Sequence, residues 1–407
     1  MIFSIFVISF FLFLSLTRSY PHPDFETIAR STGDDWNTYA RYALDIKHNG
    51  ILMPLERRAF YCPGSFLYSY FLALSLVIFG VKSLPIFVMQ HLMLGISVTI
   101  VYWTFRNKMR DLTSMLFFIS MLVFAFKDVY KNYSPLLLSE NLAIFLLSLF
   151  FLCFIKGFEK DIFPLQIASA CLLGLSILTR PNIVFFGIVL IPIVAVHYIR
   201  KKKNFMMKIL LFTIVLFASS SLLMVRNYLV CGKLYFLPEQ VSTISFVKLC
   251  HPVPASVDIS RVDSNFLYAK LRISHDIVSY AEYAIQQPAV FFGYYFKKVV
   301  FCLGYLPALS SAYELRLRWV LMWIGYFVYL ILRVRKRERF DTWETAMHCF
   351  IFTFYASLIL SGPVESYGFR MLIPGLNFVL AFSFMALDRI SSKSALNHNG
   401  DPDTRAK

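Results

Sequence analysis

The chain has 407 residues, of which 58% are hydrophobic, and its formal net charge is +16. Soluble domains contain about 45–50% apolar residues, and the excess here is concentrated in long runs with few charges. These runs are continuous rather than alternating, so the chain is predicted to cross the membrane as helices rather than fold as a soluble domain or a β-barrel. The basic residues cluster in short loops between the runs, which excludes nucleic-acid binding as the reason for the charge and suits anionic lipid head groups.

The N-terminal part contains three predicted elements. Residues 2–17 form a short apolar run without an Ala-x-Ala-like cleavage site, and further membrane segments follow, which favours an uncleaved anchor over a signal peptide. After it, residues 27–47 have the pattern of an amphipathic helix within a polar region. Residues 63–80 are apolar and aromatic, and by length alone they are able to cross a membrane.

Nine further apolar runs follow, at residues 85–104, 113–126, 137–155, 163–178, 183–199, 208–225, 318–332, 344–361 and 371–387. The loops between them alternate in charge. Strongly basic loops occur at 106–110, 156–160, 200–203 and 333–339, and poorly basic loops occur around 127–136, 179–182 and 362–369. The positive-inside rule places the basic loops in the cytoplasm. With ten spans, both termini are then cytoplasmic, provided that residues 63–80 form an interfacial or re-entrant helix instead of an eleventh span.

The predicted architecture is therefore an all-α polytopic membrane protein of about ten transmembrane helices, with juxtamembrane or re-entrant helices in two large outer loops, 17–84 and 226–317. In the second loop, residues 287–306 are apolar but carry Lys297 and Lys298 in their middle, which suits a helix lying in the membrane interface. The membrane domain is predicted to cover residues 1–387, and residues 388–407 to form a polar cytoplasmic tail without stable structure.

Three carboxylates fall on the predicted outer side. Asp34 and Asp35 are adjacent in the first outer loop, and Glu140 lies at the outer end of the run 137–155. A carboxylate there is able to take the proton from an attacking hydroxyl group. The alternatives stay open, because Asp34 before a helical stretch is also a common N-cap, and Glu140 is also consistent with an interfacial glutamate in water.

Three arginines, Arg180, Arg226 and Arg370, fall on the same side. A guanidinium group binds phosphate through two parallel hydrogen bonds, so arginines near carboxylates suit a phosphate leaving group. Head-group anchoring is the alternative for each. A glycine-rich phosphate loop is absent from the sequence, and the runs carry almost no ionisable residues in their middle, which disfavours a nucleotide-driven pump and an ion-coupled transporter.

The order of these motifs resembles the GT-C superfamily of membrane glycosyltransferases, and within it the dolichyl-phosphate-mannose protein mannosyltransferases and bacterial aminoarabinose transferases. Asp35, Tyr39 and Ala43 match the acidic-loop spacing of that family. The other similar segments are Pro63 to Gly80, Ser139-Glu140, Thr179-Arg180-Pro181, Arg226-Asn227-Tyr228 with Gly232, and Arg370 to Pro374.

The resemblance implies an inverting transferase that moves a sugar from a polyprenyl-phosphate donor, its co-substrate, to a lipid, glycan or protein acceptor. The reaction would take place on the extracytoplasmic face of a bacterial inner membrane or of the endoplasmic reticulum. Asp35, or Asp34 beside it, would be the catalytic base, and Glu140 would orient the acceptor. Donor phosphate would be held by Arg226 and Arg370, then Arg180, with Tyr39 and Tyr367 as further substrate-binding candidates. No metal is implied, since the family includes metal-independent members.

Some features depart from the family pattern. Asp34-Asp35 stands where an Asp-Glu pair is commoner, a single Pro63 after Cys62 replaces a double proline, and no large extramembrane domain follows the last run. These departures leave the acceptor class, the sugar and the organism undetermined. Alternative functions are a flippase for lipid-linked glycans, a non-catalytic membrane scaffold, and a membrane ligase of glycan polymers, which would not need the carboxylate pair.

Overall fold

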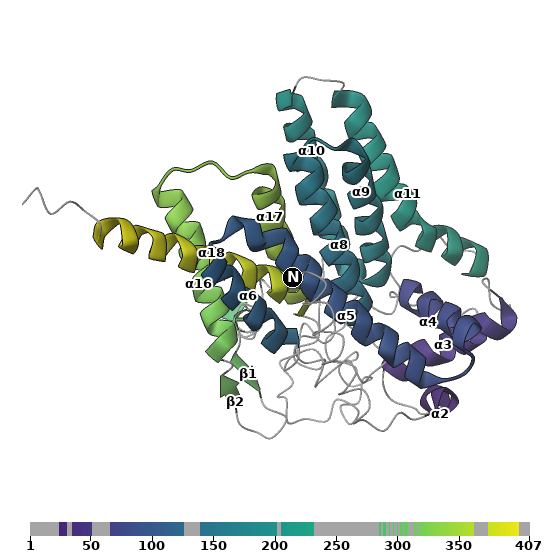
Figure 1. The fold of residues 1–407 in the computed structure, drawn as a ribbon. Helices are drawn as coiled ribbons and strands as arrows, with labels where there is room; N and C mark the ends of the chain where they lie inside the picture. The colour runs from purple at the N-terminus through teal and green to yellow at the C-terminus, as the bar shows by residue number, and fades with distance from the viewer. Residues whose placement is uncertain are drawn as a thin grey trace, which may run out of the picture.

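The computed structural model describes residues 24–30, 35–50, 66–125, 139–201, 205–231, 317–361 and 373–398, with isolated positions between 285 and 315. Within these ranges the chain is helical apart from one small hairpin (Figure 1). The helices are α2 (Phe25–Arg30), α3 (Asp35–Asn49), α4 (Phe66–Phe79), α5 (Ser83–Phe105), α6 (Asp111–Phe124), α8 (Glu140–Glu159), α9 (Phe163–Thr179), α10 (Val184–Lys201), α11 (Phe205–Cys231), α16 (Leu317–Arg335), α17 (Thr342–Ser361) and α18 (Ile373–His398). Short 3-10 turns η2 (Arg106–Lys108) and η4 (Pro181–Ile183) follow α5 and α9, and strands β1 (Tyr305–Pro307) and β2 (Tyr313–Leu315) pair antiparallel.

The predicted all-α membrane architecture is confirmed. Each of the nine apolar runs predicted after residue 80 corresponds to one helix, and only α11 and α18 continue clearly beyond the predicted end of the run. Four described segments are long and apolar enough to cross a membrane, namely Ser83–Lys108, Glu140–Glu159, Pro181–Lys201 and Phe205–Arg226. Leu67–Phe79, Asp111–Phe124 and Phe163–Thr179 are shorter apolar helices. The number of ten spans stays a prediction, and the first run, residues 2–17, lies outside the described residues.

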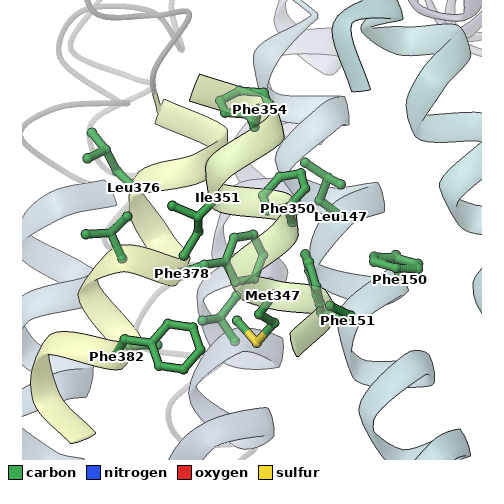
Figure 2. Packing of buried hydrophobic residues seen from close by; sticks show 14 of the residues in the cluster. Leu147, Phe150, Phe151, Met347, Phe350, Ile351, Phe354, Leu376, Phe378 and Phe382 are labelled. Atoms are coloured by element: carbon green, nitrogen blue, oxygen red, sulfur yellow. The ribbon is translucent and has the colours of Figure 1, made fainter. Parts of the chain in front are cut away.

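Aromatic side chains from α8, α17 and α18 form the centre of the main core (Figure 2). The ring of Phe151 on α8 has its centroid 5.2 Å from that of Phe350 on α17 and 4.4 Å from that of Phe378 on α18. Between helices in lipid, the hydrophobic effect contributes little, because the lipid tails are as apolar as the side chains. Close ring packing of this kind, summed over many weak contacts, therefore holds the three helices together.

Small residues let two helix pairs approach closely. A Cβ atom added to Gly174 on α9 would lie 1.8 Å from the Ser219 hydroxyl on α11, and one added to Gly325 on α16 would lie 2.7 Å from the Cβ of Ser383 on α18. Neither position has room for a side chain. Such contacts are the usual way for membrane helices to gain packing area, and here they fix α9 against α11 and α16 against α18.

The basic loops gather at one end of the bundle. Lys108 after α5 pairs with Glu159 at the end of α8, while Lys201 at the end of α10 lies 3.5 Å from Asp161 in the α8–α9 loop. Lys108 also lies 4.8 Å from the ring centroid of Trp343, at the start of α17. Three of the loops that the positive-inside rule assigns to one side, and the start of the helix that follows the fourth, are thus joined by direct contacts in the fold.

The opposite end carries α2, α3 and α4, drawn in purple and blue-violet at the lower right of Figure 1. A second apolar cluster joins these helices to α5 and to the first turns of α8. The α4 helix of 14 residues is about 21 Å long, against about 30 Å for the hydrocarbon core of a bilayer. Length alone does not separate α4 from a spanning helix, because α6, which corresponds to the predicted span 113–126, also has 14 residues. That residues 63–80 re-enter the membrane rather than cross it therefore stays a prediction.

Two boundaries differ from the sequence prediction. Helix α18 continues to His398, so residues 388–398 of the expected unstructured tail are helical. The cause is tertiary: Asp388 lies 2.9 Å from Arg110 and accepts a hydrogen bond from Thr113, and Arg389 lies 2.7 Å from Glu338. Helix α11 likewise continues to Cys231, which places Arg226 inside a helix rather than at the start of an outer loop.

Candidate active site

A buried ion pair lies at the end of the bundle opposite the basic loops. Glu140 is the first residue of α8, and Arg180 follows the last residue of α9. An Nη atom of Arg180 lies 3.1 Å from a carboxylate oxygen of Glu140, and the two side chains are 8% and 4% exposed. Pro181 follows directly and opens η4, which ends α9 at this level and holds Arg180 in an extended conformation. Glu140 is thus not the solvated interfacial glutamate that the sequence left open.

Tyr68 on α4 lies near the start of α8. Its side chain is fully buried, and it belongs to the same apolar cluster as Leu142, two residues after Glu140. The Tyr68 hydroxyl donates a hydrogen bond to the side-chain oxygen of Gln90 on α5, which is also fully buried. The site therefore contains a hydrogen-bonded tyrosine, a glutamine and an ion pair, contributed by α4, α5, α8 and α9.

Helix α3 brings the first predicted base toward the same region. The Tyr39 ring of α3 meets the Tyr68 ring edge-on, with centroids 5.3 Å apart and planes at 83°. Asp35 is the first residue of α3, four residues before Tyr39. The contact between Tyr39 and Tyr68 thus joins the helix that begins at Asp35 to α4. Asp34 lies outside the described residues.

Of the three arginines predicted to hold phosphate, the structure describes Arg180 and Arg226. Arg226 on α11 is 6% exposed. Helices α9 and α11 run in the same direction and touch at Gly174 and Ser219, so Arg180 and Arg226 lie about 9 and 10 Å further along their chains, at a similar level. Both buried arginines therefore lie toward the same end of the bundle as Glu140. Arg370 and Tyr367 lie outside the described residues.

Sequence reasoning missed three polar residues of this region, namely Tyr68, Gln90 and His91. All three are buried, and the Nδ1 atom of His91 donates a hydrogen bond to the Phe87 carbonyl oxygen one turn earlier. A signal was present, since Gln90 and His91 interrupt the otherwise apolar run 85–104, and polar residues inside a membrane segment indicate a site. Tyr68 gave no such signal, because it lies among the aromatic residues of an apolar helix.

Metal ligands do not gather in the part of the chain that the structure describes: no group of three His, Cys, Asp or Glu side chains there is arranged to hold an ion. Glu140 and Arg180 form a buried pair at this end, and their charges offset one another. What the described site offers chemically is therefore a buried charge pair and polar hydrogen-bonding groups.

Comparison with known proteins gives two matches of different kinds. Residues 63–224 match the family model described as dolichyl-phosphate-mannose-protein mannosyltransferase. The fold matches that of the Archaeoglobus fulgidus oligosaccharyltransferase tethered with an acceptor peptide, with a TM-score of 0.53, 13% sequence identity and coverage of 100% of this chain. The chain has a GT-C fold.

Two further structures of the same archaeal enzyme agree. The apo form matches with a TM-score of 0.53 and 13% identity over 98% of this chain, and the complex with an inhibitory peptide and a dolichol-phosphate matches with 0.52 and 13% over 99%. The chain spans about half of the oligosaccharyltransferase chain, since 51–52% of the latter is covered. No curated protein sequence matches the chain. The expected resemblance to the GT-C superfamily is confirmed, and at this identity the structures establish the fold alone.

Proposed function

We propose that the protein is a membrane glycosyltransferase that moves a sugar from a polyprenyl-phosphate donor to a lipid, glycan or protein acceptor, with inversion at the sugar carbon. The family match over residues 63–224 supports the reaction class. The buried Glu140–Arg180 pair next to the helix that begins at Asp35 is the observation that carries the proposal. Charges in a water-excluded site are costly and are usually kept for function.

The family resemblance supports the following roles. Asp35 accepts the proton of the acceptor hydroxyl as its oxygen attacks the sugar, and the donor phosphate leaves with the bonding electrons of the broken C–O bond. Arg226 and Arg370 bind the departing phosphate, with Arg180 as a further contact. Glu140 orients the acceptor and, through Arg180, keeps the local charge balanced. Tyr39 and Tyr367 contact the substrates.

The site is proposed to face the extracytoplasmic side. Glu140 begins α8 and Glu159 ends it, and a helix of 20 residues is about 30 Å long, close to the thickness of the hydrocarbon core. The basic loops at the Glu159 end are the cytoplasmic ones by the positive-inside rule. Glu140 then lies at the opposite surface, where a lipid-linked sugar displayed outside the cytoplasm would reach it.

The test is sugar transfer by purified membranes supplied with a radiolabelled polyprenyl-phosphate hexose or pentose. Asp35→Asn is expected to lower transfer by about 10²–10⁴-fold, the usual contribution of a general base, while the amount of folded protein stays unchanged. Asp24→Asn, at an exposed aspartate just before α2, is the matched control and should leave transfer unchanged.

Different results would lead to different conclusions. Loss of transfer with Asp34→Asn instead of Asp35→Asn would keep the reaction and move the base by one residue. Normal transfer by both variants, above a control without enzyme, would overturn the mechanism. Absence of transfer from every polyprenyl-phosphate donor would favour a flippase of lipid-linked glycans.

A further inference from the structure

Tyr68 occupies the centre of the contacts around the candidate site. Its side chain is fully buried, and its hydroxyl group donates to Gln90. A buried phenol hydroxyl without a partner would cost about 1–3 kcal/mol, so this hydrogen bond holds the Tyr68 ring in one position between α4 and α5. The Phe71 ring, one turn further along α4, lies 5.9 Å from the Tyr68 ring and stacks on it.

Tyr68 contacts the helix that carries the proposed base. Its ring is met edge-on by Tyr39, which lies one turn after Asp35 on α3. An edge-on aromatic pair has a defined geometry and contributes about 0.5–1.5 kcal/mol beyond its buried area. A shift of the Tyr68 ring would therefore move the first turn of α3, and with it Asp35.

Tyr68 also packs near the start of α8, because Tyr68 and Leu142, two residues after Glu140, belong to the same apolar cluster. The same side chain thus meets α3 through its ring, binds α5 through its hydroxyl group, and lies in the cluster that includes the first turns of α8.

We propose that Tyr68 is a positioning residue, which sets the distance between Asp35 and the Glu140–Arg180 pair through its hydrogen bond to Gln90. This inference rests on the proposed glycosyl transfer and deepens it. Transfer requires the base and the charged groups to be placed to within a fraction of an ångström, and a misplacement of about 1 Å costs about 10²-fold in rate. Tyr68 does not itself exchange a proton with the substrate.

The fold contains a matched control for this proposal. At the basic end, the Tyr198 hydroxyl of α10 donates to the side-chain oxygen of Gln166 on α9 at 2.5 Å, and both residues are buried. The two tyrosine–glutamine pairs have the same chemistry and comparable burial, but only one lies beside the site. Tyr68→Phe and Tyr198→Phe therefore remove the same hydroxyl group from opposite ends of the bundle.

The experiment compares the kinetics and thermal stability of these two variants in detergent, with Gln90→Leu as a second route to the same loss. We expect Tyr68→Phe and Gln90→Leu to lower kcat by about 10–100-fold while KM for the polyprenyl-phosphate donor changes by less than about twofold. Tyr198→Phe should lower Tm to a similar extent as Tyr68→Phe and leave kcat within about twofold of wild type.

The results separate this inference from the proposed function. Wild-type transfer that is lost in Asp35→Asn but kept in Tyr68→Phe and Gln90→Leu would overturn the positioning role and leave the reaction intact. Equal loss of kcat in Tyr68→Phe and Tyr198→Phe would also overturn it, because the effect would then be one of general stability. If Tyr68→Phe does not fold, Gln90→Leu decides. Absence of transfer by the wild type would overturn both proposals.

Discussion

The two ends of α8 each carry a glutamate in an ion pair, but the surroundings of the two pairs differ. Glu140 begins the helix and pairs with Arg180, with side chains 4% and 8% exposed, whereas Glu159 ends it and pairs with Lys108, with side chains 34% and 28% exposed. Both are carboxylate–cation pairs between neighbouring helices or loops. The first lies in surroundings without water, where charges interact strongly and are expensive to leave alone. The second is screened by solvent and contributes little.

The same contrast extends to the rest of each end. At the basic end the charges are numerous and shared, as at Asp161, which has Lys201 at 3.5 Å and Lys208 at 3.8 Å. At the Glu140 end the Glu140–Arg180 pair is buried and the neutral Tyr68 and Gln90 lie in the same region, although the Arg30–Glu26 pair of α2 is exposed. A redundant, partly exposed network tolerates changes, while a buried pair does not. The difference indicates that residues kept for chemistry are to be sought around Glu140, and residues kept for membrane topology at the basic end.

The largest effect on stability is expected when the buried pair is broken. Glu140→Gln leaves the Arg180 charge without its partner carboxylate, which should lower the free energy of unfolding by about 3–5 kcal/mol. Glu159→Gln at the other end of the helix should lower it by less than about 1 kcal/mol. Thermal and denaturant unfolding in detergent would measure both. Equal losses in the two variants would remove the distinction between the ends.

A smaller effect that depends on pH is expected at the α16–α17 loop. Hydrogen bonds from Arg333 and Arg389 lower the pKa of Glu338 to about 2, although its side chain is about one third exposed. Because the pKa in the folded protein is below that of the unfolded chain, about 4.3, the stabilisation is fully present above about pH 5 and is lost as the pH falls toward 2.

Glu338→Gln tests this directly. The variant should be less stable than wild type by about 1 kcal/mol at pH 7, after allowance for solvent screening. The difference in Tm between the two proteins should shrink steadily between pH 5 and pH 3. A difference that stays constant over this range would show that the charge of Glu338 is not the source of the stabilisation.

The smallest effect is expected at the exposed, shared network. Lys201→Gln removes one of the two lysines near Asp161, and Lys208 remains. The free energy of unfolding should change by less than about 0.5 kcal/mol, and the change should vanish at 1 M salt, where the screening length falls to about 3 Å. A loss as large as that of Glu140→Gln would contradict the contrast between a redundant end and a buried one.

Much of the membrane architecture follows from local pattern. The nine runs from 85–104 to 371–387 were found from hydrophobic length alone, because a helix in lipid must be continuously apolar whatever it packs against. The sidedness of the basic loops also follows from local composition. The end of α18 could not be predicted this way, since Asp388 and Arg389 are polar residues that become ordered only through Arg110, Thr113 and Glu338, which lie far away in the sequence.

The candidate site shows the same division. The sequence by itself determined the types and order of the candidate residues, including Asp35, Tyr39, Glu140 and Arg180, because their spacing relative to the apolar runs is a local property. Only the tertiary structure decided that Glu140 pairs with Arg180 and that Tyr68 and Gln90 lie in the same region. The physical reason is that helix length and sidedness are set by each segment's own contact with lipid, whereas a buried polar pair depends on which helices approach each other. That approach is decided by close packing between segments distant in the sequence, such as Gly174 against Ser219.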